Sequence, residues 1–172
     1  MLAVVAVAAT VQAPWAASRR SPKPKREPVV WSGKVVGVTD GDTVAVLRDG
    51  KDKVTIRLQG IDAPERSQAF GTRSKQHASD LCFGKDVQVR DEGHDRYGRT
   101  LGWLKLPDGR DVAHEMVRAG MAWWYRYFAR NEKELEDLEA AARAGRAGLW
   151  ADAAPEAPWD YRRRASAARK KH

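Results

Sequence analysis

The chain has 172 residues, enough for one domain with a single hydrophobic core and short tails. Of its net charge of +8, residues 19–27 carry +4 and residues 161–172 carry +6, which leaves −2 for residues 28–160. The one cysteine, Cys82, excludes an internal disulfide and is typical of a buried structural thiol. The histidines lack zinc-site spacing, and no glycine-rich phosphate loop or serine nucleophile motif is present.

Residues 1–28 differ in composition from the rest of the chain. The stretch 2–13 is mostly apolar, is too short to span a bilayer as a helix, and is similar to the hydrophobic part of an export signal. The basic start of such a signal is missing. Two interpretations follow: an exported protein (periplasmic or secreted), which we favour, or a cytoplasmic one. Residues 19–28 read as a basic, proline-rich linker.

Five strands are predicted from alternating or aliphatic runs bounded by turn residues. They cover residues 31–38, 43–48, 53–60, 86–91 and 100–106. Strands interleaved with short helices are compatible with a small Greek-key barrel.

Three helices are predicted between and after these strands. The first covers residues 72–83, the second follows an Asp111 cap, and the third follows a capping box of Asn131 and Glu134 and stops at Gly148. The domain is therefore expected over residues 29–152, with residues 153–172 as a basic, disordered tail. Such basic ends are typical of nucleic-acid contacts and equally of solubilising segments.

Two acidic turns flank the third predicted strand, at residues 40–42 (Asp-Gly-Asp) and 62–65 (Asp-Ala-Pro-Glu). Between them residues 53–59 alternate, which puts Arg57 on the face opposite the aliphatic side chains. Each piece alone has a structural explanation, since Asp-Gly is a common hairpin turn and an arginine is common on an exposed strand face. Together they indicate a hard cation and an anionic substrate held side by side.

These motifs resemble the thermonuclease (staphylococcal nuclease-like) family. The resemblance spans about residues 31–150 and rests on Asp40-Gly41-Asp42-Thr43, Arg57-Leu58, Ile61-Asp62-Ala63-Pro64-Glu65, Asp95-Arg96-Tyr97-Gly98-Arg99, residues 112–120 and Gly148-Leu149-Trp150. It implies an α+β fold, a small five-stranded OB-type Greek-key β-barrel with about three helices.

The resemblance also implies a role for each site residue. The implied catalytic residues are Arg57, Glu65 and Arg99. The implied metal ligands are Asp42, Asp62 and the backbone carbonyl of Ala63. The implied substrate contacts are Tyr97 and a tyrosine of residues 123–128, with Tyr125 and Tyr127 as candidates. The implied cofactor is Ca²⁺, which accepts irregular sets of oxygen ligands. The family prototype has threonine where Ala63 stands, but the expected ligand there is main chain.

One stretch departs from the family pattern, and the role of a second stretch has two interpretations. Residues 66–71 are shorter than the prototype's exposed loop, so its lysine contacts to nucleotide have no counterpart here. The aromatic residues of 123–128 fit either stacking on bases or a hydrophobic lid under the last helix.

The expected activity is calcium-dependent hydrolysis of DNA and RNA, with single strands preferred, 3′-phosphate products, and a monomer without a membrane span. Glu65 would act as general base and the two arginines would bind phosphate. The alternatives are a non-catalytic nuclease-like module that binds nucleic acid or protein, and an adhesin that acts through its basic tails.

Overall fold

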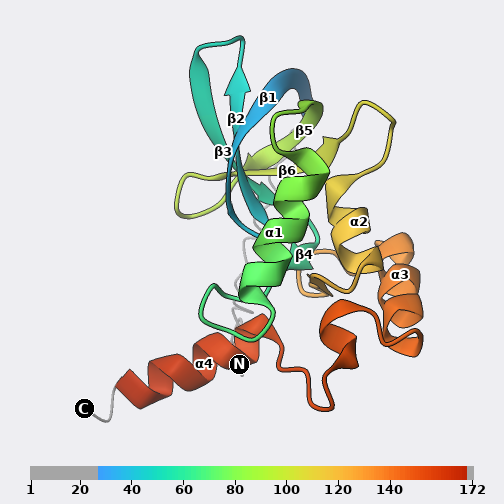
Figure 1. Ribbon diagram of the computed structural model, residues 1–172. Coiled ribbons are helices and arrows are strands. Elements are labelled where there is room, and N and C mark those ends of the chain that lie inside the picture. The colour runs from blue at the N-terminus through green and yellow to red at the C-terminus, as the bar shows by residue number, and fades with distance from the viewer. Residues whose placement is uncertain (1–26, 170–172) are drawn as a thin grey trace, which may run out of the picture.

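The computed structural model describes residues 27–169, in which five strands close into a barrel (Figure 1). Around the barrel the order is β1, β2, β3, β6 and β5, and only β3 and β6 pair in parallel. This confirms the predicted α+β fold with a five-stranded OB-type barrel, and the predicted strand ends are within three residues of the observed ones. The strands are β1 (Val29–Asp40), β2 (Thr43–Arg48), β3 (Asp52–Leu58), β5 (Asp86–His94) and β6 (Thr100–Lys105).

Strand β1 closes the barrel because its 12 residues are long enough to pair with two strands. Residues 29–34 pair with β5, and residues 33–40 pair with β2. Two register shifts interrupt the pairing with β2, and such irregularities bend a strand and increase its twist. The second shift lies between Val38 and Asp40, so it sets the direction in which the chain enters the first acidic turn.

The alternation predicted for the third strand is present in β3. Ile56 and Leu58 are buried inside the barrel, and Arg57 between them points to the opposite face. The barrel core is aliphatic, as a closed sheet of this size requires. Its fully buried members include Val35, Val44, Val46, Ile56, Val89 and Leu104.

The described residues contain four α-helices, against about three predicted. α1 packs against β1, and α2 packs against α3. As predicted, the Asp111 side chain caps α2 by accepting from two backbone N–H groups, and Cys82 is buried at the end of α1. The helices are α1 (Gly71–Cys82), α2 (Val112–Arg118), α3 (Lys133–Ala144) and α4 (Pro158–Arg169), with a 3-10 turn η1 (Gly148–Ala151).

The predicted ends of the third helix are wrong. The backbone N–H of Lys133 donates to the backbone carbonyl of Asn131 at 3.1 Å, and the predicted capping box with Glu134 does not form. At its other end the helix is capped by Gly145, whose N–H donates to carbonyls of the last turn. Gly148 opens η1 instead of stopping α3.

Helix α4 occupies residues 158–169 of the stretch 153–172, which was expected to be a disordered tail. Pro158 suits the first helical position, and Asp160 in the first turn complements the positive end of the helix dipole. Asp160 also accepts from Arg163 three residues on, at 2.7 Å. Local charge pairing therefore favours a helix in a stretch whose net charge alone suggests disorder.

The predicted signal-like segment and linker, residues 1–28, lie almost entirely outside the described residues. Within residues 27–169, no helix combines the length and the apolar character needed to cross a bilayer.

A second, two-stranded sheet joins the second acidic turn to the aromatic segment. β4 (Ile61–Asp62) pairs antiparallel with β7 (Trp123–Trp124). The backbone N–H of Tyr125 extends this pairing by donating to the carbonyl of Gly60 at 2.8 Å. Strands of two residues have no periodicity, so the sequence did not predict this sheet. It holds Asp62 against the buried tryptophans.

Gly41 lets the first acidic turn approach the second. Its φ is not positive, so the glycine is not required by turn geometry. A Cβ at this position would overlap the Ser74 hydroxyl and would lie 2.8 Å from the Ala63 Cβ. Ser74 cannot move aside easily, because it is fully buried and donates to the carbonyl of Met121 at 2.7 Å.

We expect Gly41→Ala to destabilise the fold by about 1–3 kcal/mol, the usual cost of inserting a methyl group into a packed interior. The matched control is Gly37→Ala on β1, where a Cβ would meet only the Ala45 Cβ at an ordinary 3.5 Å. Urea unfolding of the two variants and the parent protein measures the difference. Equal stability of the two variants would contradict the close approach.

Candidate functional site

Arg57 is the centre of the site, because its guanidinium joins the two acidic turns. Nη1 lies 2.9 Å from Oδ2 of Asp42, and Nη2 lies 2.9 Å from Oδ1 of Asp62. Nη1 also donates to the carbonyl of Ile61 at 3.0 Å. The Arg57 side chain is only 15% exposed, so these charge-assisted hydrogen bonds are largely shielded from water.

Asp42 is placed by the β1–β2 turn and is held by one ion pair and two hydrogen bonds. Besides Arg57, the backbone N–H of Ala63 donates to Oδ2 at 2.7 Å, and the Thr43 hydroxyl donates to Oδ1 at 3.0 Å. The Ala63 contact is a second direct link between the two turns. Asp40 lies two residues before Asp42. Its burial, and to a smaller extent repulsion by the Asp42 carboxylate, raise the pKa of Asp40 to about 6.

Asp62 ends the short strand β4 and is 1% exposed. Burial raises the pKa of its carboxyl group, while the hydrogen bond from Arg162 and the charge of Arg57 work in the opposite direction. A buried carboxylate of this kind needs positive partners to stay ionised. Asp62 has two, and one of them was not expected from the sequence.

That partner is Arg162 of α4. Its Nη2 donates to Oδ2 of Asp62 at 2.6 Å, and its Nη1 donates to Oε1 of Glu65 at 2.8 Å. In the sequence, Arg162 is only one of the six basic residues of the stretch 161–172. No signal distinguishes it from Arg163 and Arg164, since only the packing of α4 decides which arginine faces the carboxylates.

Glu65 lies on the loop after β4, with its side chain 39% exposed. Gln68 fixes this loop: its side-chain oxygen accepts from the Glu65 N–H at 3.1 Å, and its own N–H donates to the Glu65 carbonyl at 2.9 Å. Glu65 is thus the accessible carboxylate of the group, while Asp42 and Asp62 are buried.

Arg99 and Tyr97 lie together on the loop between β5 and β6. Arg99 immediately precedes the parallel pairing of Thr100 with Ile56, so it lies beside the strand that carries Arg57. Its Nε donates to Oδ2 of Asp95 at 2.8 Å, and its side chain is 33% exposed. The structure therefore places Arg99 next to the Arg57 strand but pairs it within its own loop.

Tyr97 is 68% exposed, and the guanidinium of Arg99 lies 5.7 Å from the centre of its ring. The loop therefore presents an aromatic face beside an arginine at the protein surface, an arrangement that suits contact with a nucleotide.

The aromatic residues of 123–128 were expected either to stack on bases or to form a hydrophobic lid, and different members of the segment fit each interpretation. Trp123 and Trp124 are buried, as expected for a lid. Tyr127 and Phe128 are 68% and 63% exposed. Tyr125 is half-buried beside β4, and its ring stacks on Trp159 of α4 with 5.4 Å between centroids. The structure thus brings Tyr125, rather than Tyr127, under the helix that reaches the carboxylates.

The buried carboxylates of Asp42 and Asp62 supply oxygen donors of the kind that a hard divalent cation accepts. Asp42 and Asp62 share the Arg57 guanidinium, and the backbone N–H of Ala63 donates to Asp42, which brings the Ala63 main chain beside the first acidic turn. In the described part of the chain, no three His, Cys, Asp or Glu side chains form a metal-binding group by themselves. A calcium ion here would therefore need carbonyl and water ligands, which calcium accepts.

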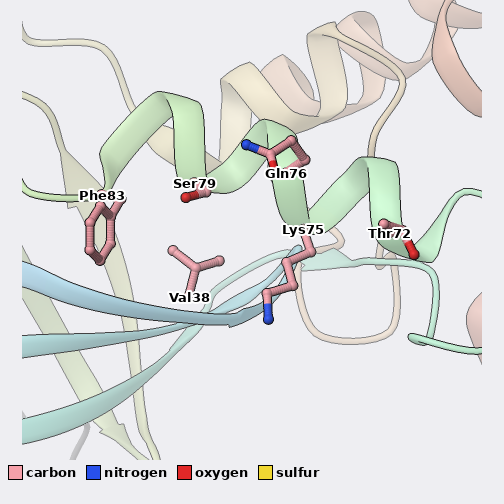
Figure 2. Close-up of a pocket in the computed structure, with 6 residues that line it drawn as sticks. All are labelled: Val38, Thr72, Lys75, Gln76, Ser79 and Phe83. Carbon is pink, nitrogen blue, oxygen red and sulfur yellow. The ribbon is translucent and has the colours of Figure 1, made fainter.

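A cavity of about 380 Å³ between β1 and α1 lies away from these groups. Figure 2 shows Val38 pointing from β1 toward α1, with Lys75 and Phe83 on the helix side. None of its lining residues is acidic, and none belongs to the predicted site. A second cavity, of about 360 Å³, adjoins the site through Pro64 and lies under the C-terminal segment.

Comparison with known proteins identifies the family. A family model described as staphylococcal nuclease homologue matches residues 55–152, a stretch that includes Arg57, Asp62, Glu65 and Arg99. The match begins after Asp42 and ends six residues before α4.

Several relatives align over most of their length. A protein named micrococcal nuclease from Shigella flexneri is 43% identical over 140 residues, which is 76% of this chain and 80% of that protein. Protein ParB from Escherichia coli is 45% identical over 140 residues, 76% of this chain and 78% of its own length. An uncharacterized endonuclease from Escherichia coli is 46% identical over 132 residues, 77% of this chain and 85% of its own length. The chain therefore belongs to the staphylococcal nuclease homologue family.

Proposed function

We propose that this chain is a calcium-dependent nuclease that hydrolyses phosphodiester bonds of DNA and RNA. The observation that carries the proposal is the position of Arg57, 2.9 Å from a carboxylate oxygen of each acidic turn. Family membership supports it, as do the names of relatives called micrococcal nuclease and endonuclease. A module that only binds would not need three carboxylates gathered around arginines.

The carboxylates of Asp42 and Asp62 and the carbonyl of Ala63 would hold the calcium ion. When bound, the ion supplies a concentrated positive charge that polarises the phosphate and orients water. Arg57 holds the two aspartates close together, because it forms an ion pair with each of them, and its charge opposes the rise in the pKa of Asp62 that burial causes. The planar, permanently charged guanidinium of Arg57 would also donate hydrogen bonds to the oxygens of a phosphate bound beside the two aspartates.

Glu65 would accept the proton of the attacking water. It is the accessible carboxylate of the group, so a water molecule can reach it from solvent. Attack at phosphorus with departure of the 5′-oxygen would leave 3′-phosphate ends. Arg99 would stabilise charge on the phosphate after exchanging its contact with Asp95 for the substrate.

The substrate contacts would come from exposed aromatic side chains on both sides of the site. Tyr97 and Tyr127 are available to solvent, and Tyr125 becomes available if α4 moves. Stacking on unpaired bases accounts for the proposed preference for single strands. The proposed form of the enzyme is an exported monomer.

Removal of calcium tests the metal requirement. We expect cleavage of a labelled single-stranded oligonucleotide to stop in EGTA and to return on addition of excess Ca²⁺, because the buried carboxylates need the ion to engage phosphate. The measurement is product formation on a gel. Cleavage that continues unchanged in EGTA would rule out the proposed metal role.

Replacement of Glu65 tests the general base. Glu65→Gln keeps the size of the side chain and removes its basicity, so we expect kcat to fall about 10²–10⁴-fold. The matched control is Glu136→Gln on α3, an exposed glutamate paired only with Lys133 among the described residues. Unchanged kcat in Glu65→Gln would assign the proton transfer to another group.

A further inference from the structure

Helix α4 lies across the candidate site, and one arginine of it contacts two of the three carboxylates. Arg162 donates to both oxygens of Asp62, at 3.2 and 2.6 Å, and to Oε1 of Glu65 at 2.8 Å. Figure 1 shows the helix (red) below the N-terminal end of α1, at the end of the barrel that bears β4. These contacts join residues about 100 positions apart in the chain.

The position of α4 is set by several contacts besides Arg162. The ring of Trp159 is stacked on Tyr125 with an interplanar angle of 20°. The hydroxyls of Tyr161 and Ser67 are 2.8 Å apart. The side chain of Gln68 donates to the carbonyl of Glu156, just before the helix, at 2.6 Å. The segment therefore docks on the loop that carries Glu65 and on a candidate base-stacking tyrosine at once.

The same oxygen atoms would be needed by a metal ion. Arg57 occupies Oδ1 of Asp62, and Arg162 occupies Oδ2 and shares Oδ1. Three carboxylates with two guanidinium groups carry one net negative charge; replacing one guanidinium by Ca²⁺ makes the group neutral.

Helix α4 also buries little of its surface, so it can detach from the candidate site. Among its side chains only Pro158 is buried, and Arg162 itself is 44% exposed. The second cavity, of about 360 Å³, lies beneath it and is lined partly by Tyr161 and Arg164. A segment with little buried surface opens at low cost.

We propose that α4 is an autoinhibitory strap, in which Arg162 occupies the calcium-binding carboxylates and Trp159 covers Tyr125 until calcium and nucleic acid displace them. This inference rests on the proposed function, because it assigns the same carboxylates to calcium. Arg162 and calcium compete for one site, so the apparent calcium affinity is lowered by the fraction of molecules in which the strap is closed.

Calcium titration calorimetry of three full-length proteins tests the competition. We expect Arg162→Gln to bind Ca²⁺ about tenfold more tightly than the parent protein, as for a strap closed in about nine molecules of ten. The matched control is Arg163→Gln, which removes the same charge one residue away. Arg163 is 80% exposed and contacts only Asp160 of its own helix among the described residues. The calcium affinity of Arg163→Gln should equal that of the parent protein.

Hydrogen–deuterium exchange of the parent protein tests displacement. We expect amides of residues 158–169 to exchange faster when Ca²⁺ is added, while those of the barrel strands exchange more slowly or at the same rate. If Arg162→Gln bound calcium more tightly only because a positive charge near the site had been removed, calcium would not change the exchange of α4 amides in the parent protein. This measurement needs no catalysis, so it separates the strap from the chemistry.

The outcomes distinguish the two proposals. If both arginine variants and the parent bind calcium equally and α4 exchange does not respond, the strap is wrong and the calcium site stands. If neither the parent nor Arg162→Gln binds calcium, the proposed calcium site is wrong and the strap falls with it. Tighter binding in Arg162→Gln alone, together with faster exchange in α4, supports the strap.

Discussion

The ion pairs of Arg57 with Asp42 and Asp62 are the contacts on which the site depends. They join the turn after β1 to the segment that begins with β4, and the backbone N–H of Ala63 adds a second bond between the same two segments. Because all three charges are largely buried, removing the arginine would leave the Asp42 carboxylate without an ion-pair partner among the described residues and the Asp62 carboxylate with Arg162 alone, so we expect the fold to lose stability. In the proposed function the stability of the fold and the chemistry depend on the same contact, which is possible because β3 places Arg57 opposite its own core face.

The C-terminal helix changes how the charges of the site balance. Without α4, the group contains the carboxylates of Asp42, Asp62 and Glu65 and the guanidinium of Arg57, an excess of negative charge that would suit a divalent cation. With α4 in place, Arg162 neutralises part of that excess and covers Asp62. The basic end of the chain is therefore part of the site, where composition suggested only a nucleic-acid contact or a solubilising tail.

Contacts within one strand or one turn could be predicted from the sequence, and contacts between distant short segments could not. The alternation in β3 and the Asp111 cap follow from residue types at fixed spacing, and both are present. The pairing of Ile61–Asp62 with Trp123–Trp124 involves strands too short for a pattern. Helix α4 was missed because its net charge outweighed the local pairing of Asp160 with Arg163. The family resemblance supplied the site residues but offered no counterpart for Arg162.

A crystal structure with bound calcium tests the central claim most directly, through the anomalous signal of the ion. The account predicts one ion with oxygen ligands from Asp42, Asp62 and the Ala63 carbonyl at about 2.3–2.6 Å, with Arg57 still between the two aspartates. An ion bound elsewhere, or the two acidic turns separated with Arg57 facing solvent, would contradict it.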